Sequence, residues 1–392
     1  MATRKSPFAK SRAKPGDGEI VVSLLPPGKQ VLTTFEYQYP LKLISPDQHT
    51  VTVKKPHHDA KLANDSTAEV PVTTVFLLTY GGGLLAGDSI NLTVNLEPHT
   101  RLALLTQGST KIFKSETTSP STTTTTSTLN QTLPTISPFT TPPTKPTSQT
   151  LNVKISAHSS LCYLPDPSQP FAKSTYTQSQ TFYLSPHGSS SLLLLDWVTE
   201  GRPALNESWT LTSWKGRNEI REFDPHTKGR LLIRDALHLF TDDIADLNSK
   251  TDGKGIIGTL IIHGPTFKSL SEFFLKEFKT HPRLGAKNWS RTPRPHTPTI
   301  REEDDSGGST GGGDYFTQHK SHSSGATTPR AKARKEEEIE GLLWTAASVR
   351  GFVLVKFGAK EVDGARRWLG GMLRREGSVE REFGRQATLC LR

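Results

Sequence analysis

The chain has 392 residues and a formal net charge of +10, from 48 lysines and arginines against 38 aspartates and glutamates. No apolar run approaches the roughly 18 residues of a membrane-spanning helix, so we expect no membrane partner. Two cysteines, Cys162 and Cys390, are too few for a disulfide framework or a thiolate zinc site. The first residues lack the apolar stretch of a secretory signal, so we expect a reducing, cytoplasmic location.

Composition divides the chain into one large domain and several polar segments. Residues 1–18 are basic and are predicted to form a disordered tail. Residues 116–150 are dominated by threonine, serine and proline, and residues 285–338 mix prolines, glycines and clustered charges. Both are predicted to be disordered inserts, because such sequences bury too little apolar surface to offset chain entropy. The rest of residues 19–373 is predicted to be a single β-rich domain, followed by a C-terminal tail of uncertain structure at residues 374–392.

The first clear elements of the domain are strands. Residues 91–97 alternate strictly, with leucine or valine at every second position. A turn at Pro98 separates them from an apolar strand at residues 101–106, and the two strands are predicted to form a hairpin. Residues 192–198 are almost entirely apolar, which predicts a strand buried on both faces. Further strands are predicted at residues 209–214, 231–233, 256–262 and 353–357.

Two later segments have helical periodicity. Apolar side chains recur at positions 267, 270, 274 and 278, and Ser269 with Glu272 would supply a capping box. A second helix is predicted over residues 362–373. Because strands dominate and their connections are short and locally antiparallel, we expect a mainly β, layered fold with about two α-helices near the C-terminal half.

The glycine-rich sequence of residues 81–88 is close to the sequence pattern of a phosphate-binding loop. Asp88 stands where such a loop has its lysine, and a carboxylate at that position would repel phosphate. The residues that follow alternate as a strand, so no helix N-terminus would face an anion. We therefore predict no nucleotide site and interpret the glycines as allowing positive φ and close packing between two strands.

Residues with catalytic or metal-binding chemistry form no recognised motif. No His-Glu-x-x-His or Gly-x-Ser-x-Gly sequence is present, which predicts neither a tight metal site nor a nucleophilic serine. The histidines at positions 57, 58, 319 and 322 are interpreted as solvated loop residues. Asp196 and Glu200 have the even spacing that places both on one strand face. Two interpretations stay open for them, a catalytic pair or a structural ion pair with Arg202.

The excess of positive charge does not predict a nucleic-acid partner. Much of it lies in the N-terminal tail and in a late cluster at residues 330–335, outside the candidate domain. No RNA-binding signature accompanies it. The positive charge can equally be interpreted as a docking surface for an acidic protein.

An ordered set of motifs resembles the urease accessory protein UreD (also called UreH) family. The residues of the first motif are Gly82, Gly83, Gly87, Asp88, Pro98, Leu105, Thr106, Gln107, Thr110, Lys111 and Phe113. Two later segments that match are Leu164-Pro165-Asp166-Pro167, and Asp196 to Glu200 followed by Gly201-Arg202. Residues 39–43 resemble the eukaryotic form, which we interpret as fungal. The chain departs from the family at the enlarged insert 116–150 and at residues 383–392, which lack the usual closing strand.

The resemblance implies a β-helix-like or layered β fold and a non-catalytic scaffold or chaperone. It implies binding to apo-urease with the accessory proteins UreF and UreG, a GTPase, and assistance with nickel delivery to the urease active site. Nickel would be handled transiently, with no permanently bound cofactor, and an internal water-filled passage is implicated in the family. Release must follow capture, so we expect polar and acidic groups at modest density along the passage. The candidates for its lining or mouth are Asp88, Asp166, Asp196 and Glu200, whereas Lys111 and Arg202 are expected to hold strand geometry.

An alternative function uses the same strands differently. A β-solenoid enzyme acting on carbohydrate would employ Asp196 and Glu200 as its two carboxylates. Such an enzyme is expected to show a regular coil repeat and a secretory signal, and the sequence shows neither.

Overall fold

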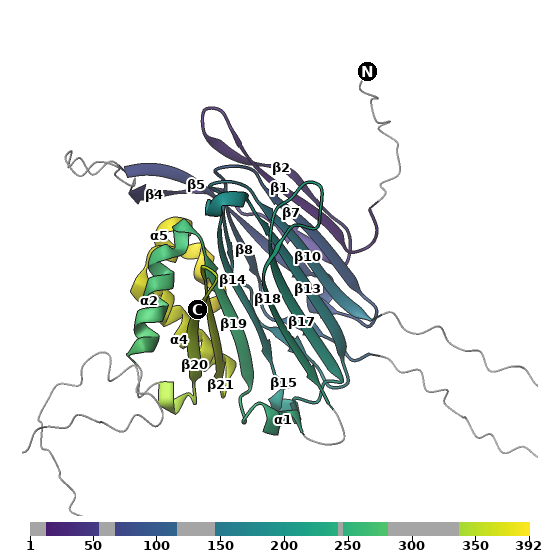
Figure 1. Ribbon diagram of the computed structural model, residues 1–392. Coiled ribbons are helices and arrows are strands. Elements are labelled where there is room, and N and C mark those ends of the chain that lie inside the picture. The colour runs from purple at the N-terminus through teal and green to yellow at the C-terminus, as the bar shows by residue number, and fades with distance from the viewer. Residues whose placement is uncertain (1–12, 55–66, 116–145, 242–245, 281–336) are drawn as a thin grey trace, which may run out of the picture.

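The computed structural model describes residues 13–54, 67–115, 146–241, 246–280 and 337–392. Two large β-sheets face each other in it, and helices cover the outer face of one of them (Figure 1). Most of the predicted tail and inserts, and the histidines at positions 57, 58, 319 and 322, lie outside the described residues. The prediction of a mainly β, layered fold is confirmed.

The first sheet has seven strands in the order β18-β17-β13-β10-β7-β1-β2. Its central strands β1, β7, β10, β13 and β17 run parallel, whereas β2 and β18 join the two edges antiparallel. The strands are β1 (Asp17–Leu25), β2 (Lys29–Tyr37), β7 (Ser89–Leu96), β10 (Thr147–Ile155), β13 (Thr175–Leu184), β17 (Ser213–Glu222) and β18 (Leu231–Phe240).

The second sheet contains twelve strands, and its main path is β20-β21-β19-β14-β11-β8-β5-β3. Here β5, β8, β11 and β14 are parallel, and the strands beyond them are antiparallel. The strands of this path are β3 (Leu41–Ile44), β5 (Thr67–Thr79), β8 (Arg101–Thr106), β11 (Ser160–Tyr163), β14 (Ser191–Thr199), β19 (Ile256–His263), β20 (Leu343–Val349) and β21 (Phe352–Ala359). Short strands complete it: β4 (His49–Lys54), β6 (Gly83–Leu84), β9 (Thr110–Ile112) and β12 (Ser168–Pro170). A separate ribbon pairs β15 (Gly201–Arg202) with β16 (Glu207–Ser208).

The chain winds repeatedly from the first sheet to the second. It passes from β7 to β8, from β10 to β11 and from β13 to β14, and each strand pairs in parallel with its counterpart in the next coil. The predicted hairpin of residues 91–97 with 101–106 is therefore wrong, because the two strands lie in different sheets. The turn at Pro98 is a corner between layers, and the expectation of locally antiparallel connections fails for the same reason.

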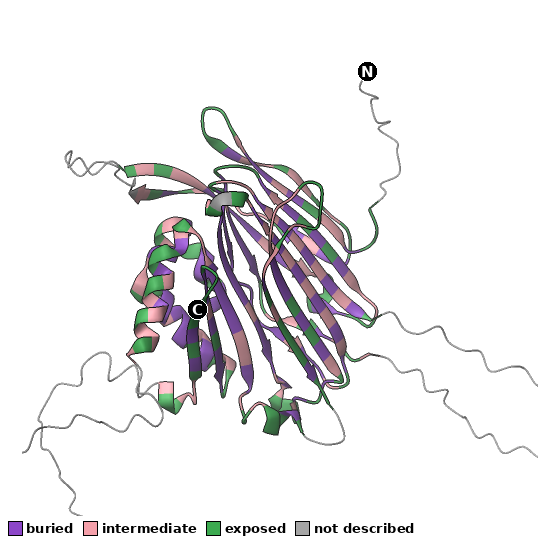
Figure 2. Ribbon diagram, in the orientation of Figure 1, coloured by how far each residue is buried: buried purple, intermediate pink, exposed green. Residues whose placement is uncertain are grey.

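Apolar ladders fill the space between the sheets. Leu92 pairs with Leu151, and Val94 with Val153, so equivalent side chains of successive coils stack in register. These residues belong to one buried cluster that includes strands of both sheets. The strict alternation predicted for residues 91–97 is confirmed, since its apolar face is the buried one (Figure 2).

The helices form the third layer. The elements here are α2 (Lys268–Lys279), α4 (Val362–Glu376), α5 (Ser378–Phe383) and the 3-10 segment η5 (Arg385–Leu391). They bury a second apolar cluster against the outer face of the second sheet. A shorter helix, α1 (Leu247–Lys250), lies between β18 and β19. Among the described residues, none of the helices has both the length and the apolar character needed to span a bilayer.

Both predicted helices are present, with corrections at their boundaries. The capping box is wrong: Phe267 is the N-cap residue of α2 without a side-chain cap, because the turn η4 (Pro265–Phe267) leads directly into the helix. The sequence predicted no definite structure for residues 374–392. In the structure they complete α4 and form α5 and η5, and the side chains of Phe383 and Leu391 are buried. The insert predicted at 116–150 ends earlier than expected, since residues 147–150 belong to β10.

Candidate functional site

Polar side chains replace apolar ones at one level between the two sheets. Gln178 on β13 and Asn218 on β17 are buried and face Asp196, which comes from β14 of the opposite sheet. Gln178 Nε2 donates to Asp196 Oδ1 at 2.8 Å, and Asn218 Nδ2 donates to Asp196 Oδ2 at 2.6 Å. A carboxylate held by two neutral amides thus bridges the layers in the middle of the core.

A small cavity lies beside this carboxylate. About 10 Å³ of it is open to the centre of a water molecule, which corresponds to room for about one water. Its lining combines hydroxyl, amide and carboxyl groups. The lining residues are Thr106, Thr110, Gln149, Tyr163, Pro165, Asp166, Ser168, Gln178, Gln180, Asp196 and Trp197.

Two buried amide oxygens at this level have no hydrogen-bond donor among the described residues. They are Gln180 Oε1 and Asn218 Oδ1. A buried polar atom without a partner is costly, and native proteins usually satisfy it with a protein group, a water or an ion. Both atoms are acceptors, as is the carboxylate of Asp196. These acceptor atoms favour a water molecule or a cation over an anion.

The environment of Asp196 favours the protonated, neutral form of its carboxyl group. Burial raises its pKa, and hydrogen bonds from Asn218 and Gln178 lower the pKa only in part. The nearby carboxylate of Asp235 raises it further, whereas Lys356 lowers it. Asp196 is consequently easier to protonate than an exposed aspartate, and the cavity carries only a modest negative potential.

Asp166 joins this cavity to a wider pocket on the helical side. It lines both spaces, and the outer pocket has a volume of about 540 Å³. Its Oδ2 accepts hydrogen bonds from the backbone N–H of Gly108 at 2.8 Å and from Thr106 Oγ1 at 3.2 Å. Its Oδ1 accepts from Arg366 Nη2 on α4 at 2.6 Å. The carboxylate thus forms part of the wall between the spaces, and an arginine of the helical layer holds it.

The cysteine in the outer pocket is a neutral thiol. Burial raises the pKa of Cys390 to about 12, and the neighbouring Asp166 adds to this effect. Its Sγ lies 3.2 Å from the backbone oxygen of Thr106, to which it donates. Burial also raises the pKa of Cys162. Both cysteines are therefore neutral thiols at neutral pH.

The structure brings together two of the four predicted carboxylates, since Asp166 and Asp196 line the same cavity. Asp88 and Glu200 are not among its lining residues. Asp88 Oδ2 accepts a hydrogen bond from the backbone N–H of Leu85 at 2.8 Å and closes its own turn. Glu200 accepts from the hydroxyl of Ser208 on β16.

The ion pair predicted for Arg202 is wrong. Arg202 pairs with Glu207 at 2.6 Å and lies over the ring of Phe171, with 3.9 Å from its guanidinium carbon to the ring centre. Asp196 instead points between the sheets, and Glu200 follows the end of β14. The carbohydrate-enzyme alternative thus loses the paired carboxylates that motivated it.

The motif glycines have the structural roles predicted for them. Gly82 and Gly87 have φ of 74° and 84°, in the left-handed region. Gly83 pairs with Lys111 of β9, and a Cβ on it would lie 2.7 Å from the Lys111 backbone oxygen. Gly201 has φ of 112° and lies against the backbone of Pro170. The residues after this loop form β7, as predicted, and no helix begins there.

Three further motif residues, Gln107, Thr110 and Pro165, line one of the two spaces, whereas Lys111 lines neither. Thr110 and Pro165 line the inner cavity, and the Pro165 backbone oxygen accepts a 2.9 Å hydrogen bond from Trp197 Nε1. Gln107 lines the outer pocket. The sequence interpretation missed Arg366 and the four amide residues. The signal for the amides was available, because Gln149, Gln178, Gln180 and Asn218 occupy inward positions of alternating strands.

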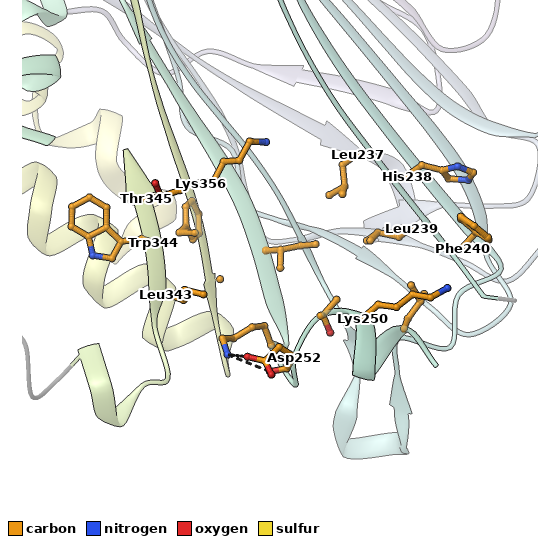
Figure 3. A pocket seen from close by; sticks show the side chains of 16 residues that line it. Leu237, His238, Leu239, Phe240, Lys250, Asp252, Leu343, Trp344, Thr345 and Lys356 are labelled. Atoms are coloured by element: carbon orange, nitrogen blue, oxygen red, sulfur yellow. Dashed lines mark hydrogen bonds and ion pairs between the residues drawn. The ribbon is translucent and has the colours of Figure 1, made fainter. Parts of the chain in front are cut away.

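A separate apolar groove lies at the open edge between the sheets, with a volume of about 590 Å³ (Figure 3). Leu237, Leu239 and Phe240 of β18 face Leu343 of β20 and other residues of the second sheet across it. An ion pair between Lys356 and Asp235, 2.6 Å long, connects the two sheets beside it. The walls are mainly leucine, isoleucine and aromatic side chains, so the groove offers apolar contact more than chemistry.

No group of three or more histidine, cysteine, aspartate or glutamate residues is placed to hold a metal ion in the part of the chain that the structure describes. The inner cavity therefore offers oxygen donors at low density. Nickel and other borderline cations bind tightly to imidazole and thiolate groups, and more weakly to isolated carboxylate and amide oxygens.

Comparisons with known proteins point to one family. The model of the UreD urease accessory protein family matches residues 16–389. A Schizosaccharomyces pombe protein named uncharacterized urease accessory protein ureD-like is 25% identical over 336 residues, covering 85% of this chain and 84% of the relative. Urease accessory protein 4 of Cryptococcus neoformans is 29% identical over 243 residues, covering 60% and 66%. Urease accessory protein D of Arabidopsis thaliana is 25% identical over 255 residues, covering 65% and 70%.

Proposed function

The chain belongs to the UreD family of urease accessory proteins, and from this premise we propose that it is a non-catalytic urease maturation factor. It binds apo-urease together with the accessory proteins UreF and UreG and assists delivery of nickel to the urease active site. Relatives from fungi and plants carry accessory-protein names, which supports a helper role over an enzymatic one.

The observation that carries the proposal is the polar cavity inside an otherwise apolar core. Asp196 and Gln180 line a space between the sheets, and Gln180 Oε1 has no hydrogen-bond donor among the described residues. A purely structural core at this level would be more stable with apolar side chains, because burial of a carboxylate is costly. The arrangement is explained if a cation passes along it and exchanges most of its water shell for these oxygen atoms.

The path that we propose runs through Asp166 and Asp196. Asp166 stands between the outer pocket and the inner cavity, and Asp196 lies deeper, between the sheets. Nickel is cargo in this scheme, and no residue keeps it. A lining of single carboxylates and amide oxygens allows entry and release, because conduction requires binding that is weak enough to leave. Asp88 and Glu200 do not line the cavity, so the path that we propose leaves them out.

Complementation of a strain that lacks this gene tests the proposal. The Asp196→Asn and Asp166→Asn variants should lower urease activity at limiting nickel at least tenfold, with nickel content per urease falling in parallel. Asp88→Asn is the matched control, because it removes a carboxylate outside the cavity, and it should support normal activation. Full activation by both cavity variants, in cells that contain normal amounts of each protein, would show that the cavity is not the path.

A further inference from the structure

The second sheet extends one strand beyond the first at the apolar groove. Lys356 of β21 pairs with Asp235 of β18, so these two strands lie opposite each other. β18 is the last strand of the first sheet, whereas the second sheet continues from β21 to β20. Among the described strands, none therefore lies opposite β20, and the layered fold is one strand short at this edge.

The inner face of β20 is exposed in consequence. Strand pairing places Thr345 beside Lys356, so the odd-numbered residues of β20 face the side of the first sheet. Leu343 is 63% exposed and Val349 is 43% exposed, and the residues between them on this face are exposed as well. Across the groove, Leu237 of β18 is also exposed (Figure 3). Contiguous exposed apolar surface of this kind marks an interaction site.

The backbone of β18 has one free edge beside this groove. Its other edge pairs with β17, and the N–H of Thr241 donates to the Thr212 oxygen in the same register. Because successive residues of an antiparallel strand face alternate edges, the N–H and C=O groups of Arg234, Ala236 and His238 point away from β17. They pair with no strand that the structure describes. An extended peptide can add to such an edge through main-chain hydrogen bonds.

The free edge is protected at one end only. Arg350 Nη1 donates to the Leu232 oxygen at 3.2 Å, and the register between β17 and β18 is irregular at the same end. Charged side chains and bulges are common protection for a sheet edge. Residues 234–240 of β18 pair regularly with β17. They present an edge as long as a typical short strand.

The outer face of the first sheet is basic beside the free edge. The charged side chains that point outward here from β17 and β18 are Lys215, Arg217, Glu219, Arg221 and Arg234. The single carboxylate, Glu219, forms ion pairs with all three arginines, so positive charge is in excess. A strand added to β18 would place its outward side chains beside this row. Opposite charges on neighbouring strands attract, so acidic residues are favoured at these positions.

We propose that the free edge of β18 binds an extended segment of a partner protein in which apolar and acidic side chains alternate. The segment continues the first sheet by one strand, with its apolar side chains on Leu343 and Leu237 and its acidic side chains beside Arg234. Strands in a sheet are about 4.8 Å apart and packed sheets about 10 Å apart, so a strand at this position covers β20.

A second copy of this chain is disfavoured as the occupant. Pairing of two β18 edges would bring the two basic faces side by side, and like charges at an interface are unfavourable. The surface goes beyond the proposed function, because its binding is measured with a peptide and needs neither nickel nor urease.

Binding of a fluorescent peptide to the purified full chain tests the surface. The probe has about seven residues, the length of a typical strand, and alternates valine with glutamate. Wild-type protein should bind it at least tenfold more tightly than Leu343→Glu protein, which places a carboxylate in the apolar groove. A peptide with lysine in place of glutamate should bind the wild type at least tenfold more weakly. Fluorescence anisotropy measures all of these affinities.

Leu85→Glu is the matched control, because it introduces the same charge at an exposed leucine outside the groove. It should bind the acidic peptide as the wild type does. Absence of binding to the wild type, equal binding of the two peptides, or unchanged binding by Leu343→Glu would overturn the proposal. A chain that sediments as a dimer and does not bind the peptide would identify a second copy as the occupant, with the same consequence.

Backbone pairing is tested separately from apolar contact. Ala236→Pro removes an N–H that points to the free edge and no hydrogen bond to β17, which an edge strand tolerates, and it should weaken peptide binding at least tenfold. In the wild type, the peptide should slow exchange of the amide hydrogens of Arg234, Ala236 and His238 at least tenfold. Protection of β20 amides in their place would show that the peptide pairs with the other sheet, contrary to the proposal.

Discussion

Asp196 and Glu219 show how the partners of a buried carboxylate decide its behaviour. Burial raises the pKa of Glu219, but the hydrogen bond and charge of Arg221, together with Arg234 and Arg217, outweigh it and the pKa falls. Asp196 has neutral amides as its hydrogen-bond donors, so burial dominates and its pKa rises. Glu219 is therefore a stabilising residue at neutral pH, whereas Asp196 costs stability and is better explained by function.

This cost gives Asp196 a definite pH dependence. A carboxyl whose pKa is raised by folding binds its proton more tightly in the folded protein than in the unfolded chain. Its stabilising contribution is present below the unfolded value of 3.8 and is lost as the pH rises through the raised value. An Asp196→Asn variant has no such proton to lose.

The melting temperature of the Asp196→Asn protein relative to that of the wild type should therefore rise as the pH is raised from 4 to 7.5. The amide of Gln178 can turn to accept a hydrogen bond from the new asparagine, so the substitution leaves the core packed. Melting temperatures of both proteins at the two pH values measure the effect. A difference between the proteins that stays constant with pH would contradict the raised pKa.

Residue identity alone gave part of the candidate site. Asp166 and Asp196 could be named from the sequence because they are acidic and stand inside recognisable motifs. Their common cavity could not, because Asp166 is placed by Thr106 and held by Arg366, which is distant in sequence. Asp88 and Glu200 are also acidic residues within these motifs. In the structure, however, Asp88 binds the backbone of Leu85 in its own turn and Glu200 binds Ser208 of the β15–β16 ribbon, so neither lines the cavity.

At the scale of elements, the coil explains which sequence predictions failed. Alternating strands with a proline turn between them fit a hairpin and a coil corner equally well, because both need a change of direction at the same place. The partner that decides between them is the next coil, and the insert after β9 separates β7 from that partner β10 in the sequence. Elements and their buried faces could thus be predicted, whereas their pairing depended on contacts far along the chain.

The glycine at the start of β6 tests this packing of one element on another. In Gly83→Ala, the new Cβ would lie 2.7 Å from the Lys111 oxygen and 2.6 Å from the ring of Phe113, so β9 must shift. We expect a loss of about 1–3 kcal/mol in the free energy of unfolding, as for other overpacked sites. Urea titration measures it.

Gly371→Ala is the matched control for this substitution. Gly371 lies within α4, and a Cβ there meets nothing within 4 Å. Alanine should stabilise the helix by up to about 1 kcal/mol, because glycine is the poorer helix former. Equal effects of the two substitutions would show that close packing of β6 on β9 does not matter.

For the whole molecule, the second sheet ties the layers together. Alternate residues of its strands point to opposite sides, so Leu104 and Leu194 belong to the cluster between the sheets, and Leu105 and Leu195 to the cluster beneath the helices. Hydrogen bonds also connect the last helices to the early strands, since Arg101 binds Glu382 and His49 binds the Phe383 backbone. The two clusters are thus expected to unfold in one cooperative transition.

Phe383→Ala tests whether damage to the helical layer reaches the first sheet. Phe383 is fully buried and stacks on Phe267 with 5.5 Å between ring centres. Its truncation should cost about 3–5 kcal/mol, the usual value for a buried phenylalanine. Amide hydrogens of β10, in the opposite sheet, should then exchange faster by the same free energy, because they open only when the whole domain unfolds. Leu389→Ala, which truncates an exposed side chain of the same segment, should leave their exchange unchanged. Unaltered β10 exchange in Phe383→Ala would mean that the layers unfold separately.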